Sequence, residues 1–257
     1  MNSNVGIDLM IPLSAHIRKI VWETEDTFTL LLEPAKPLDK GGRHNFNFSP
    51  GQFNMLYAFG VGESAISISS DPSKNDNIAH TIHRVGSVTS VLSQLEKGDV
   101  IGLRGPFGNG WPVEKAKGKD VCIVTGGIGL APLRPVLYSI FNNRKDYGKI
   151  FLLYGARSPL DLLYRVELEK WGKMKDVTVQ VIVDRCDTSW KGHIGVVTKL
   201  FSYIKLNTAN TIAMICGPEI MMKKALEICN KYKVECEASV ERYMKCGFGI
   251  CGNCMID

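Results

Sequence analysis

The sequence predicts two consecutive domains, an antiparallel β-barrel and a parallel-sheet α/β domain, followed by a small cysteine-rich lobe. Three observations predict this order. Short strand-like runs separated by turn residues fill residues 1–113, and strand and helix patterns alternate over residues 114–235. In residues 236–257, three of the eight cysteines gather near the end. Closely spaced short strands are typical of barrels and sandwiches, whereas alternating strands and helices are typical of parallel sheets covered by helices.

The composition is that of an ordinary globular protein and narrows the classes of ligand. A chain of 257 residues fits one or two domains, and 45% hydrophobic and 22% charged residues are usual values. The net charge of +5 comes without a dense basic run, which favours phosphate-bearing small ligands over nucleic acid. Because there is no apolar run of 18 residues and no signal-peptide pattern, we expect a cytoplasmic protein that does not associate with membranes.

The first domain is expected to hold six strands and one short helix. Runs rich in β-branched and apolar residues predict the strands, and glycine, proline and aspartate separate them. The helix follows Gly86 and Ser87. The strands are expected at residues 17–23, 27–33, 52–58, 65–69, 78–85 and 100–103, and the helix at residues 89–95.

Two segments of this domain are candidate ligand contacts. Alternating serines in residues 65–70 place hydroxyl groups on one face of a strand, where they bond a flavin or a phosphate, or form only a half-buried polar face. Residues 84–89 run from a strand end through a glycine turn into a helix, which suits an anion, although Ser87 is equally explained as a helix cap. His83 and Arg84 are candidate phosphate contacts or simply solvated side chains.

The second domain is expected to form a parallel sheet with helices on both faces. Its strands are predicted at residues 121–125, 150–154, 177–183 and 211–216, and its helices at residues 133–142, 160–171, 196–203 and 218–231. Ligands of such sheets bind at the carboxyl ends of the strands. The segments that follow those ends are therefore the candidate site.

A glycine-rich turn between the first strand and helix of this domain is the central candidate. Gly126, Gly127 and Gly129 allow a sharp turn and a close approach of the backbone to a ligand. Pro132 suits the first helical position. A turn of this kind before a helix N-terminus predicts a cradle for a dinucleotide pyrophosphate. A tight turn without a ligand remains the alternative, because Pro132 stands where the usual fingerprint has its third glycine.

Other strand ends supply further candidates. Arg157 after the second strand is a candidate contact to the adenosine ribose or its 2′-phosphate, or a plain surface arginine. Asp184, Arg185 and Lys191 follow the third strand and are candidates for the same role. Cys216, which precedes Gly217 and Pro218, is placed either near a nicotinamide ring or in the core as a small apolar side chain.

The last segment carries the most specific pattern in the chain. Cys246, Cys251 and Cys254 have the spacing C-x₄-C-x₂-C, which is three-quarters of the plant-type pattern for a 2Fe–2S cluster. A zinc site is disfavoured because it usually shows two C-x₂-C pairs or nearby histidines. A cluster needs a fourth ligand, so we expect the C-terminus to be shortened, with Cys236 or a partner chain as the other possible sources.

Several phrases together resemble one family. Residues 50–57 (PGQFNMLY), 59–63 (FGVGE), 104–108 (RGPFG), 126–135 (GGIGLAPLRP) and 241–246 (ERYMKC) are similar to the ferredoxin–NADP reductase superfamily, in its branch with a C-terminal 2Fe–2S cluster. Within that branch they look most like gamma subunits of cytosolic NiFe hydrogenases and sulfhydrogenases. Electron-transfer subunits of dihydroorotate dehydrogenase B and of anaerobic sulfite reductase are related. The resemblance covers essentially the whole chain.

The resemblance implies FAD in the β-barrel domain, NADP or NAD in the α/β domain and an iron–sulfur cluster in the lobe. One departure concerns the flavin site, where residues 64–67 read Ser-Ala-Ile-Ser and lack the arginine of the family's R-x-Y-S. Cys246, Cys251 and Cys254 are the implied metal ligands. The implied cofactor-binding residues are Ser64, Ile66, Ser67, Ile68, Ile82, His83, Arg84, Gly86, Val88, Thr89, Gly126, Gly127, Gly129, Leu130, Ala131, Pro132, Arg157, Asp184, Cys216, Gly217 and Pro218.

The implied function is that of an electron-transfer subunit, or diaphorase. NAD(P)H carries two electrons as hydride and a cluster takes one at a time, so a flavin must stand between them. The implied partners are iron–sulfur and catalytic subunits of a larger complex, with a NiFe hydrogenase favoured over dihydroorotate dehydrogenase or sulfite reductase. A redox-sensing or binding subunit without turnover, and a zinc-stabilised nucleotide-binding protein, are alternatives of other classes. Arg157, Arg185 and Lys191 favour NADP slightly over NAD.

Overall fold

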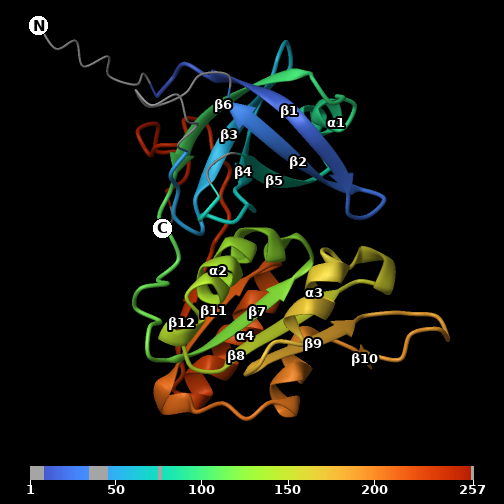
Figure 1. The fold of residues 1–257 in the computed structure, drawn as a ribbon, viewed down its shortest axis with the longest axis vertical. Helices are drawn as coiled ribbons and strands as arrows, with labels where there is room; N and C mark the ends of the chain where they lie inside the picture. Colours follow the sequence, from blue (N-terminus) through green and yellow to red (C-terminus); the bar gives the residue numbers. More distant parts are fainter. Residues whose placement is uncertain (1–8, 35–45, 75–76, 256–257) are drawn as a thin grey trace, which may run out of the picture.

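The computed structural model describes residues 9–34, 46–74 and 77–255, which form two domains lying one against the other (Figure 1). The first domain is built on an antiparallel sheet and the second on a parallel sheet flanked by helices, as the sequence predicts. Within the described residues, no helix is both long enough and apolar enough to cross a membrane.

The first sheet has six strands in the order β4-β3-β6-β1-β2-β5. Its edges meet where Ile68 forms a bridge with His80 and the Ser69 N–H donates to the Ala79 carbonyl over 2.8 Å, which closes the sheet into a barrel. One short helix, α1 (Ser87–Leu92), lies over it. The strands are β1 (Leu13–Trp22), β2 (Thr27–Pro34), β3 (Phe53–Ala58), β4 (Gly62–Ser67), β5 (Ile78–His83) and β6 (Val100–Phe107).

Alternation of apolar side chains along these strands fills the barrel. Phe28, Leu30 and Leu32 of β2 point inward and are fully buried, as are Ile101 and Leu103 of β6. Side chains two positions apart share a face of a strand, so this pattern sets which face of the sheet is the interior. Residues between these positions face outward, and some of them meet the second domain or the C-terminal segment.

Several boundaries in this domain differ from the sequence-based expectation; for example, β1 begins at Leu13 rather than residue 17, and β6 ends at Phe107 rather than residue 103. Two further differences have a local cause. The fourth strand begins at Gly62 rather than residue 65, because it pairs with β3 directly from the tight turn at Gly60, which has φ +77°. The helix begins at Ser87 rather than residue 89. Thr89 explains this, since its hydroxyl accepts the N–H of Val85 and of Gly86 and so closes the first turn early.

The second sheet is parallel and has the order β10-β9-β8-β7-β11-β12. Helices α2 (Leu130–Asn142) and α3 (Arg165–Trp171) pack on one face, and α4 (Glu219–Tyr232) and the 3₁₀ helix η4 (Val197–Tyr203) pack on the other. The strands are β7 (Asp120–Gly126), β8 (Ile150–Ala156), β9 (Val177–Val183), β10 (His193–Ile194), β11 (Thr211–Cys216) and β12 (Glu235–Ala238).

Several elements of this domain correct the expectation. The expected helix at residues 160–171 is a 3₁₀ turn at Pro159–Asp161 followed by α3, which starts only after Tyr164 in a left-handed conformation (φ 51°). The expected helix at residues 196–203 is the 3₁₀ helix η4. Edge strands β10 and β12 were not foreseen, and β12 extends the second sheet to Ala238.

Polar contacts hold the two domains together. The Tyr164 hydroxyl donates to Thr81 Oγ1 of β5 over 2.6 Å, and Arg134 Nη1 of α2 donates to the Ser69 carbonyl over 3.3 Å. Arg134 also stacks over the Tyr164 ring, with its guanidinium carbon 4.1 Å from the ring centroid. Buried hydrogen bonds of this kind fix the relative orientation of two surfaces more narrowly than apolar contact alone.

The segment after β12 returns to the first domain, where it lies beside β6 and β3 (red in Figure 1). Arg104 of β6 donates from Nη1 to the Cys246 carbonyl over 3.1 Å. Phe248 meets Phe107 of β6, with ring centroids 5.9 Å apart. The cysteine-rich segment therefore packs on the barrel domain and not on the sheet that precedes it.

Candidate functional site

The glycine-rich turn lies at the point where the strand order of the second sheet reverses. From β7 the chain proceeds outward through β8 and β9 on one side, and it returns to β11 on the other side. The turn after β7 and the Cys-Gly-Pro turn after β11 thus stand side by side at the carboxyl edge of the sheet. Such a reversal opens a crevice between diverging connections and is where parallel α/β sheets bind ligands.

Close backbone packing explains the glycines of these turns. A Cβ atom at Gly129 would lie 2.4 Å from the Cys216 carbonyl oxygen, so the helix start and the second turn approach each other only without a side chain. Gly127 differs, since it has φ +55° and a Cβ there would meet nothing within 4 Å. Gly129 thus brings the turns together, while Gly127 borders open space with bare backbone beside the start of α2.

The other predicted residues of the turns have mainly structural positions. Leu130, Ala131 and Pro132 are buried in the first turn of α2, which begins at Leu130 rather than at Pro132. Cys216 is 2% exposed, and burial raises the pKa of its thiol to about 12, with the nearby Glu241 carboxylate adding to the effect. The thiol therefore stays protonated near neutral pH and is not a nucleophile.

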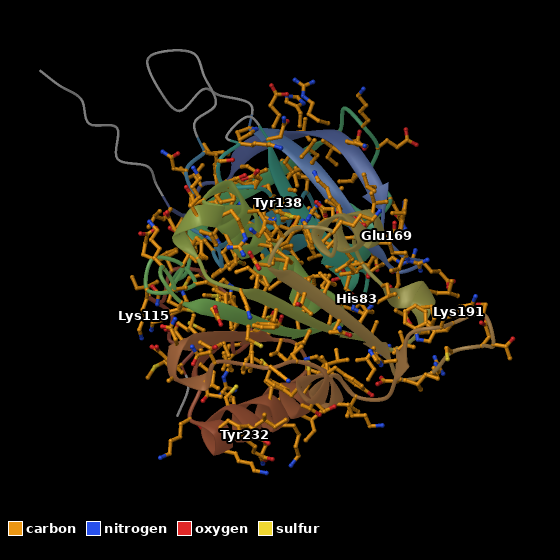
Figure 2. All side chains as sticks on the ribbon, turned by 60° about the horizontal axis from the view of Figure 1, so that its bottom comes forward. His83, Lys115, Tyr138, Glu169, Lys191 and Tyr232 are labelled. Carbon is orange, nitrogen blue, oxygen red and sulfur yellow. The ribbon has the colours of Figure 1, made fainter. Side chains whose placement is uncertain are left out.

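The basic residues proposed for a 2′-phosphate are divided between two places. Arg157 and Arg185 are exposed and adjacent, because the Arg185 N–H donates to the Arg157 carbonyl over 3.0 Å beyond the ends of β8 and β9. Asp184 lies beside them. Lys191, in contrast, lies on the loop between β9 and β10, which projects away from the domain (Figure 2). Arg157 and Arg185 form the more compact cation pair.

Strand β4 presents the predicted flavin contacts only in part. Every residue of β4, including Ser64, Ile66 and Ser67, is partly exposed, as expected of a strand available to a ligand. Ile68 and Ile82 are 0% and 1% exposed and belong to the barrel core. Their side chains pack inside the barrel, so the expectation that they face a cofactor is not supported by their position.

A buried pair behind β4 was missed by the sequence reasoning. The imidazole of His80 is fully buried, with Nδ1 3.0 Å from the Ser67 carbonyl and Nε2 3.0 Å from Asn54 Nδ2. These partners fix the tautomer, since a carbonyl must receive a proton from Nδ1 and an amide nitrogen donates to Nε2. Burial lowers the pKa of His80 to about 4. The only available signal was a histidine that follows two apolar residues in a predicted strand.

Some groups of residues 83–89 are exposed, and others already have hydrogen-bond partners within the protein. His83 Nε2 lies 3.0 Å from Asp26 Oδ2, and the Arg84 guanidinium stands 5.8 Å from the Trp22 ring centroid. Gly86 is exposed, whereas Thr89 is 7% exposed and uses its hydroxyl in the helix cap. The backbone of the turn and the Arg84 side chain are thus accessible to a ligand. The Thr89 side chain fixes the conformation of the turn.

The three tail cysteines are brought together incompletely. The Cys246 sulfur receives the backbone N–H of Cys251, which is the main reason its pKa is lowered to about 6. The N–H groups of Phe248 and Ile250 and the Cys251 thiol act in the same direction, against burial. Cys251 is exposed and Cys254 is half-buried. Among the described residues, no three His, Cys, Asp or Glu side chains stand together as a metal-ligand set.

Sequence relatives agree with this arrangement. The family model of the oxidoreductase NAD-binding domain matches residues 123–227, which span the glycine-rich turn through α4. The sulfhydrogenase 2 gamma subunit of Pyrococcus furiosus is 35% identical over 96% of this chain and 90% of its own length. A probable electron-transfer subunit of dihydroorotate dehydrogenase B (NAD⁺) from Methanocaldococcus jannaschii is 34% identical over 96% of this chain and 84% of its own length.

The chain belongs to the ferredoxin–NADP reductase family of FAD- and NAD(P)-binding oxidoreductases. Its fold is shared with a solved NADH-dependent reduced ferredoxin–NADP oxidoreductase, with TM-score 0.75 and 26% identity over 93% of this chain and 80% of that one. As a member of this reductase family it is a flavin oxidoreductase that binds NAD(P). The reversal point of the second sheet and the partly exposed strand β4 are the candidate surfaces for these two cofactors.

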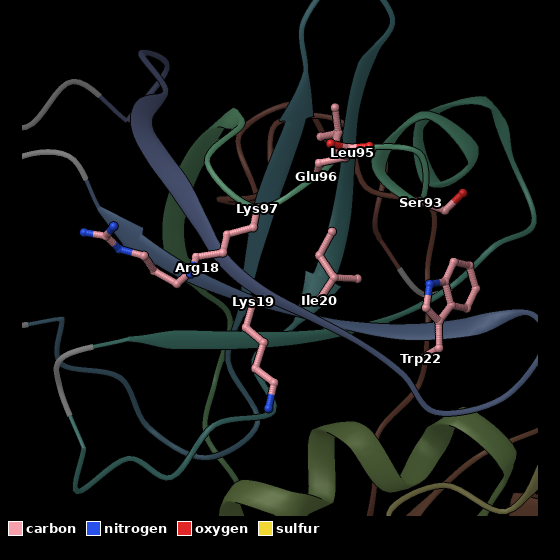
Figure 3. Close-up of a pocket in the computed structure, with 8 residues that line it drawn as sticks. All are labelled: Arg18, Lys19, Ile20, Trp22, Ser93, Leu95, Glu96 and Lys97. Carbon is pink, nitrogen blue, oxygen red and sulfur yellow. The ribbon is translucent and has the colours of Figure 1, made fainter.

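One depression on this reductase is lined by residues of neither surface. It holds about 500 Å³ beside the outer face of β1 and the end of α1 (Figure 3). None of the predicted site residues contributes to it. Its lining residues are Arg18, Lys19, Ile20, Trp22, Ser93, Leu95, Glu96 and Lys97. Three of these residues are basic and one is acidic, so the depression is basic.

Proposed function

We propose that this chain is an electron-transfer subunit that exchanges hydride between NAD(P)H and FAD and passes single electrons to a 2Fe–2S cluster held by the C-terminal cysteines. One observation carries the proposal. The Cys246 loop is seated on β6 and β3, and β3 pairs directly with β4, so the two candidate cofactor sites share one sheet. FAD supplies the two-electron to one-electron conversion when bound.

The residues of the first domain fit a flavin in specific ways. Ser64 and Ser67 offer hydroxyls on the exposed strand β4, and Ile66 offers an apolar contact. Arg84, with Gly86 and Val88 in the turn before and within α1, is placed to meet phosphate oxygens through a guanidinium and bare backbone. This chain lacks the arginine of the family's R-x-Y-S motif, and the Arg84 guanidinium would take its place at the phosphate.

The residues of the second domain fit a dinucleotide. Gly127 leaves backbone exposed at the reversal point, where a pyrophosphate lies in parallel sheets, while the buried Gly126 and Gly129 let the two turns pack closely beside it. Gly217 and Pro218 of the second turn form the opposite wall, with Cys216 buried behind them. Arg157 is placed for the adenosine end, and its charge favours NADPH over NADH.

The cysteines of the tail suit a metal cluster that takes thiolate ligands. A sulfur that receives several backbone N–H groups is stabilised as thiolate, and the pKa of Cys246 lowered to about 6 reflects this. Cys246, Cys251 and Cys254 would supply three ligands of a cluster. Cys236 is an unsuitable fourth ligand, because it lies in β12 and its thiol contacts that of Cys229. A further ligand, for example from a partner chain, would complete the set.

The partner complex is proposed from the relatives. The Pyrococcus furiosus protein is a sulfhydrogenase subunit, which favours a hydrogenase of the NiFe type, with further iron–sulfur subunits, as the destination of the electrons. The similar identity to a dihydroorotate dehydrogenase B subunit makes that complex the second candidate.

Metal and flavin analysis of the untagged complex, purified without air from its native source, tests the partner. Nickel with iron and FAD is the expected result. Iron and FAD without nickel would reject the hydrogenase, and the masses of the co-purifying chains would then identify the partner.

Two pairs of variants test the assignments within the chain. Cys246→Ser should lose iron and keep FAD, whereas Cys186→Ser, a half-buried cysteine outside the tail, should keep both. Retention of iron in Cys246→Ser would reject the cluster site.

Arg157→Ala should reduce kcat/KM more with NADPH than with NADH, and equal losses would reject the role of Arg157.

A further inference from the structure

Arg104 of β6 is the one buried arginine that joins the barrel to the cysteine-rich tail within the described residues. Its side chain is 2% exposed, and four of its five N–H groups have protein acceptors. Nε and Nη2 donate to the two carboxylate oxygens of Glu63 over 3.0 and 2.6 Å. Nη1 donates to the Leu9 carbonyl over 2.6 Å and to the Cys246 carbonyl over 3.1 Å.

This arrangement connects the two candidate cofactor sites through one side chain. Glu63 belongs to β4, whose later residues Ser64, Ile66 and Ser67 are the proposed flavin contacts. Cys246 is the first proposed cluster ligand. A bidentate arginine–carboxylate pair is geometrically restrictive, so the position of the Cys246 backbone is set relative to β4.

Strand register supports the same connection. Met55 of β3 pairs with Arg104 on one side and with Ala65 of β4 on the other, and side chains directly opposite in antiparallel pairs share a face. Phe53 pairs in the same way with Phe107 and Ser67. In β4 this outer face carries Glu63, Ala65 and Ser67, so the tail shares a face with the proposed flavin contact Ser67, whereas Ser64 and Ile66 lie on the opposite face.

The tail packs closely against this face of the sheet. Gly247 has φ +87°, and a Cβ there would lie 2.9 Å from Phe107 Cδ2 and 3.0 Å from Met55 Cγ. The rings of Phe248, Phe107 and Phe53 follow one another with centroid separations of 5.9 and 6.0 Å. A loop so closely seated is sensitive to the group that anchors its first residue.

We infer that Arg104 is a positioning residue that holds the Cys246 loop against the flavin-bearing strand and thereby sets the electron exchange between the two cofactors. The inference rests on the proposed function. It concerns the chain's own contacts, since Arg104 touches the backbone of a proposed ligand and a carboxylate of β4 but not the reacting atoms. Its loss should therefore act on the tail and spare the chemistry at the second domain.

The test compares Arg104→Gln with Arg18→Gln in the complete chain with its cofactors, loaded without air. Arg18 is the matched control, because it also pairs with a glutamate, Glu33, in the same barrel but is exposed. The measurements are FAD and iron content, the electron paramagnetic resonance spectrum of the reduced cluster, the rate of flavin reduction by NAD(P)H, and the rate of electron transfer from flavin to cluster.

For Arg104→Gln we expect FAD content and flavin reduction to stay within about twofold of the parent. We expect the cluster to lose iron, or its spectrum to shift with flavin-to-cluster transfer slowed by about tenfold or more, the usual size for loss of an outer partner. Unchanged iron, spectrum and transfer rate would overturn the inference. Parallel loss of FAD and iron would also overturn it, because it indicates general destabilisation.

Two further variants keep the inference testable if Arg104→Gln does not fold. Glu63→Gln removes the carboxylate while leaving Arg104 its two carbonyl acceptors, and it should reproduce the slow transfer in part. Arg104→Lys retains the charge without the fork and should fall between the parent and Arg104→Gln. Parent-like behaviour of both would overturn the inference. Failure of the proposed function is distinct, since the parent chain itself would then lack iron or FAD.

Discussion

The buried imidazole of His80 should make the stability of the protein depend on pH between about 4 and 6.5. Burial lowers its pKa from 6.5 to about 4 in the folded protein. In this interval the unfolded chain binds a proton that the folded chain excludes, so acid favours unfolding. The stabilisation is fully present above pH 6.5 and is lost as the pH falls through 4. The direction follows from the depressed pKa of the folded state.

The size of the effect follows from the same pKa values. At about 1.4 kcal/mol per pH unit, the interval from 6.5 to about 4 corresponds to about 3 kcal/mol in total. About 2 kcal/mol of this should be lost between pH 7 and pH 5, because the folded imidazole is still mostly neutral at pH 5 while the unfolded one is charged. His80 is fully buried, so solvent screening reduces this figure little.

Urea unfolding of the parent and His80→Gln at pH 7 and pH 5 measures the effect. Glutamine keeps a donor for the Ser67 carbonyl and an acceptor for Asn54 but does not titrate in this range. The parent should lose about 2 kcal/mol more than His80→Gln over this interval. His16→Gln removes a half-buried histidine of β1 and controls for the loss of an imidazole as such. Equal losses in the parent and His80→Gln would refute the reasoning.

Two further substitutions test the packing of the site. Gly129→Ala places a Cβ 2.4 Å from the Cys216 carbonyl oxygen and should abolish tight NAD(P)H binding, measured by fluorescence titration. Gly118→Ala, before β7 and outside the proposed site, faces open space and should bind NAD(P)H at a cost of only about 1–2 kcal/mol in stability for its positive φ. Equal binding by the two variants would contradict the packing argument. Tyr164→Phe removes the donor to Thr81 Oγ1 between the domains and should lower the urea-derived stability by about 1–2 kcal/mol, and an unchanged midpoint would show that this bond adds nothing.

The second domain was predictable because its strands are buried on both faces. Such strands are continuous apolar runs, and residues 121–125 and 211–216 stand out for this reason. The glycine-rich turn was equally visible, since its function requires bare backbone. The edge strands β10 and β12 were not visible, because two or four residues of mixed polarity carry no periodic signal. The 3₁₀ helix η4 was read as an α-helix because short runs of both kinds have similar apolar spacing.

Side-chain roles that depend on register escaped the sequence reasoning. Ile68 was assigned to the flavin from its place beside the serines, yet it pairs with His80 and lies in the core. Successive residues of a strand face opposite sides of the sheet. A strand start predicted at residue 65 instead of Gly62 therefore gives no way to tell which residues of β4 face a ligand and which face the core. Ser64, Ile66 and Ser67 keep their candidate role because every residue of β4 is partly exposed.

The cysteine-rich tail shows most clearly which features local sequence predicts and which depend on how distant strands pair. Its spacing alone predicted a glycine-permitted loop, and Gly247, Gly249 and Gly252 do have positive φ. Nothing in that spacing identifies Arg104 as its anchor, because the two are 142 residues apart and meet only through the pairing of β6 with β3. Pairing of distant strands thus decides which faces and cofactor sites become neighbours. In this chain it places the cysteine-rich loop on the outer face of the sheet that contains β4, the proposed flavin strand.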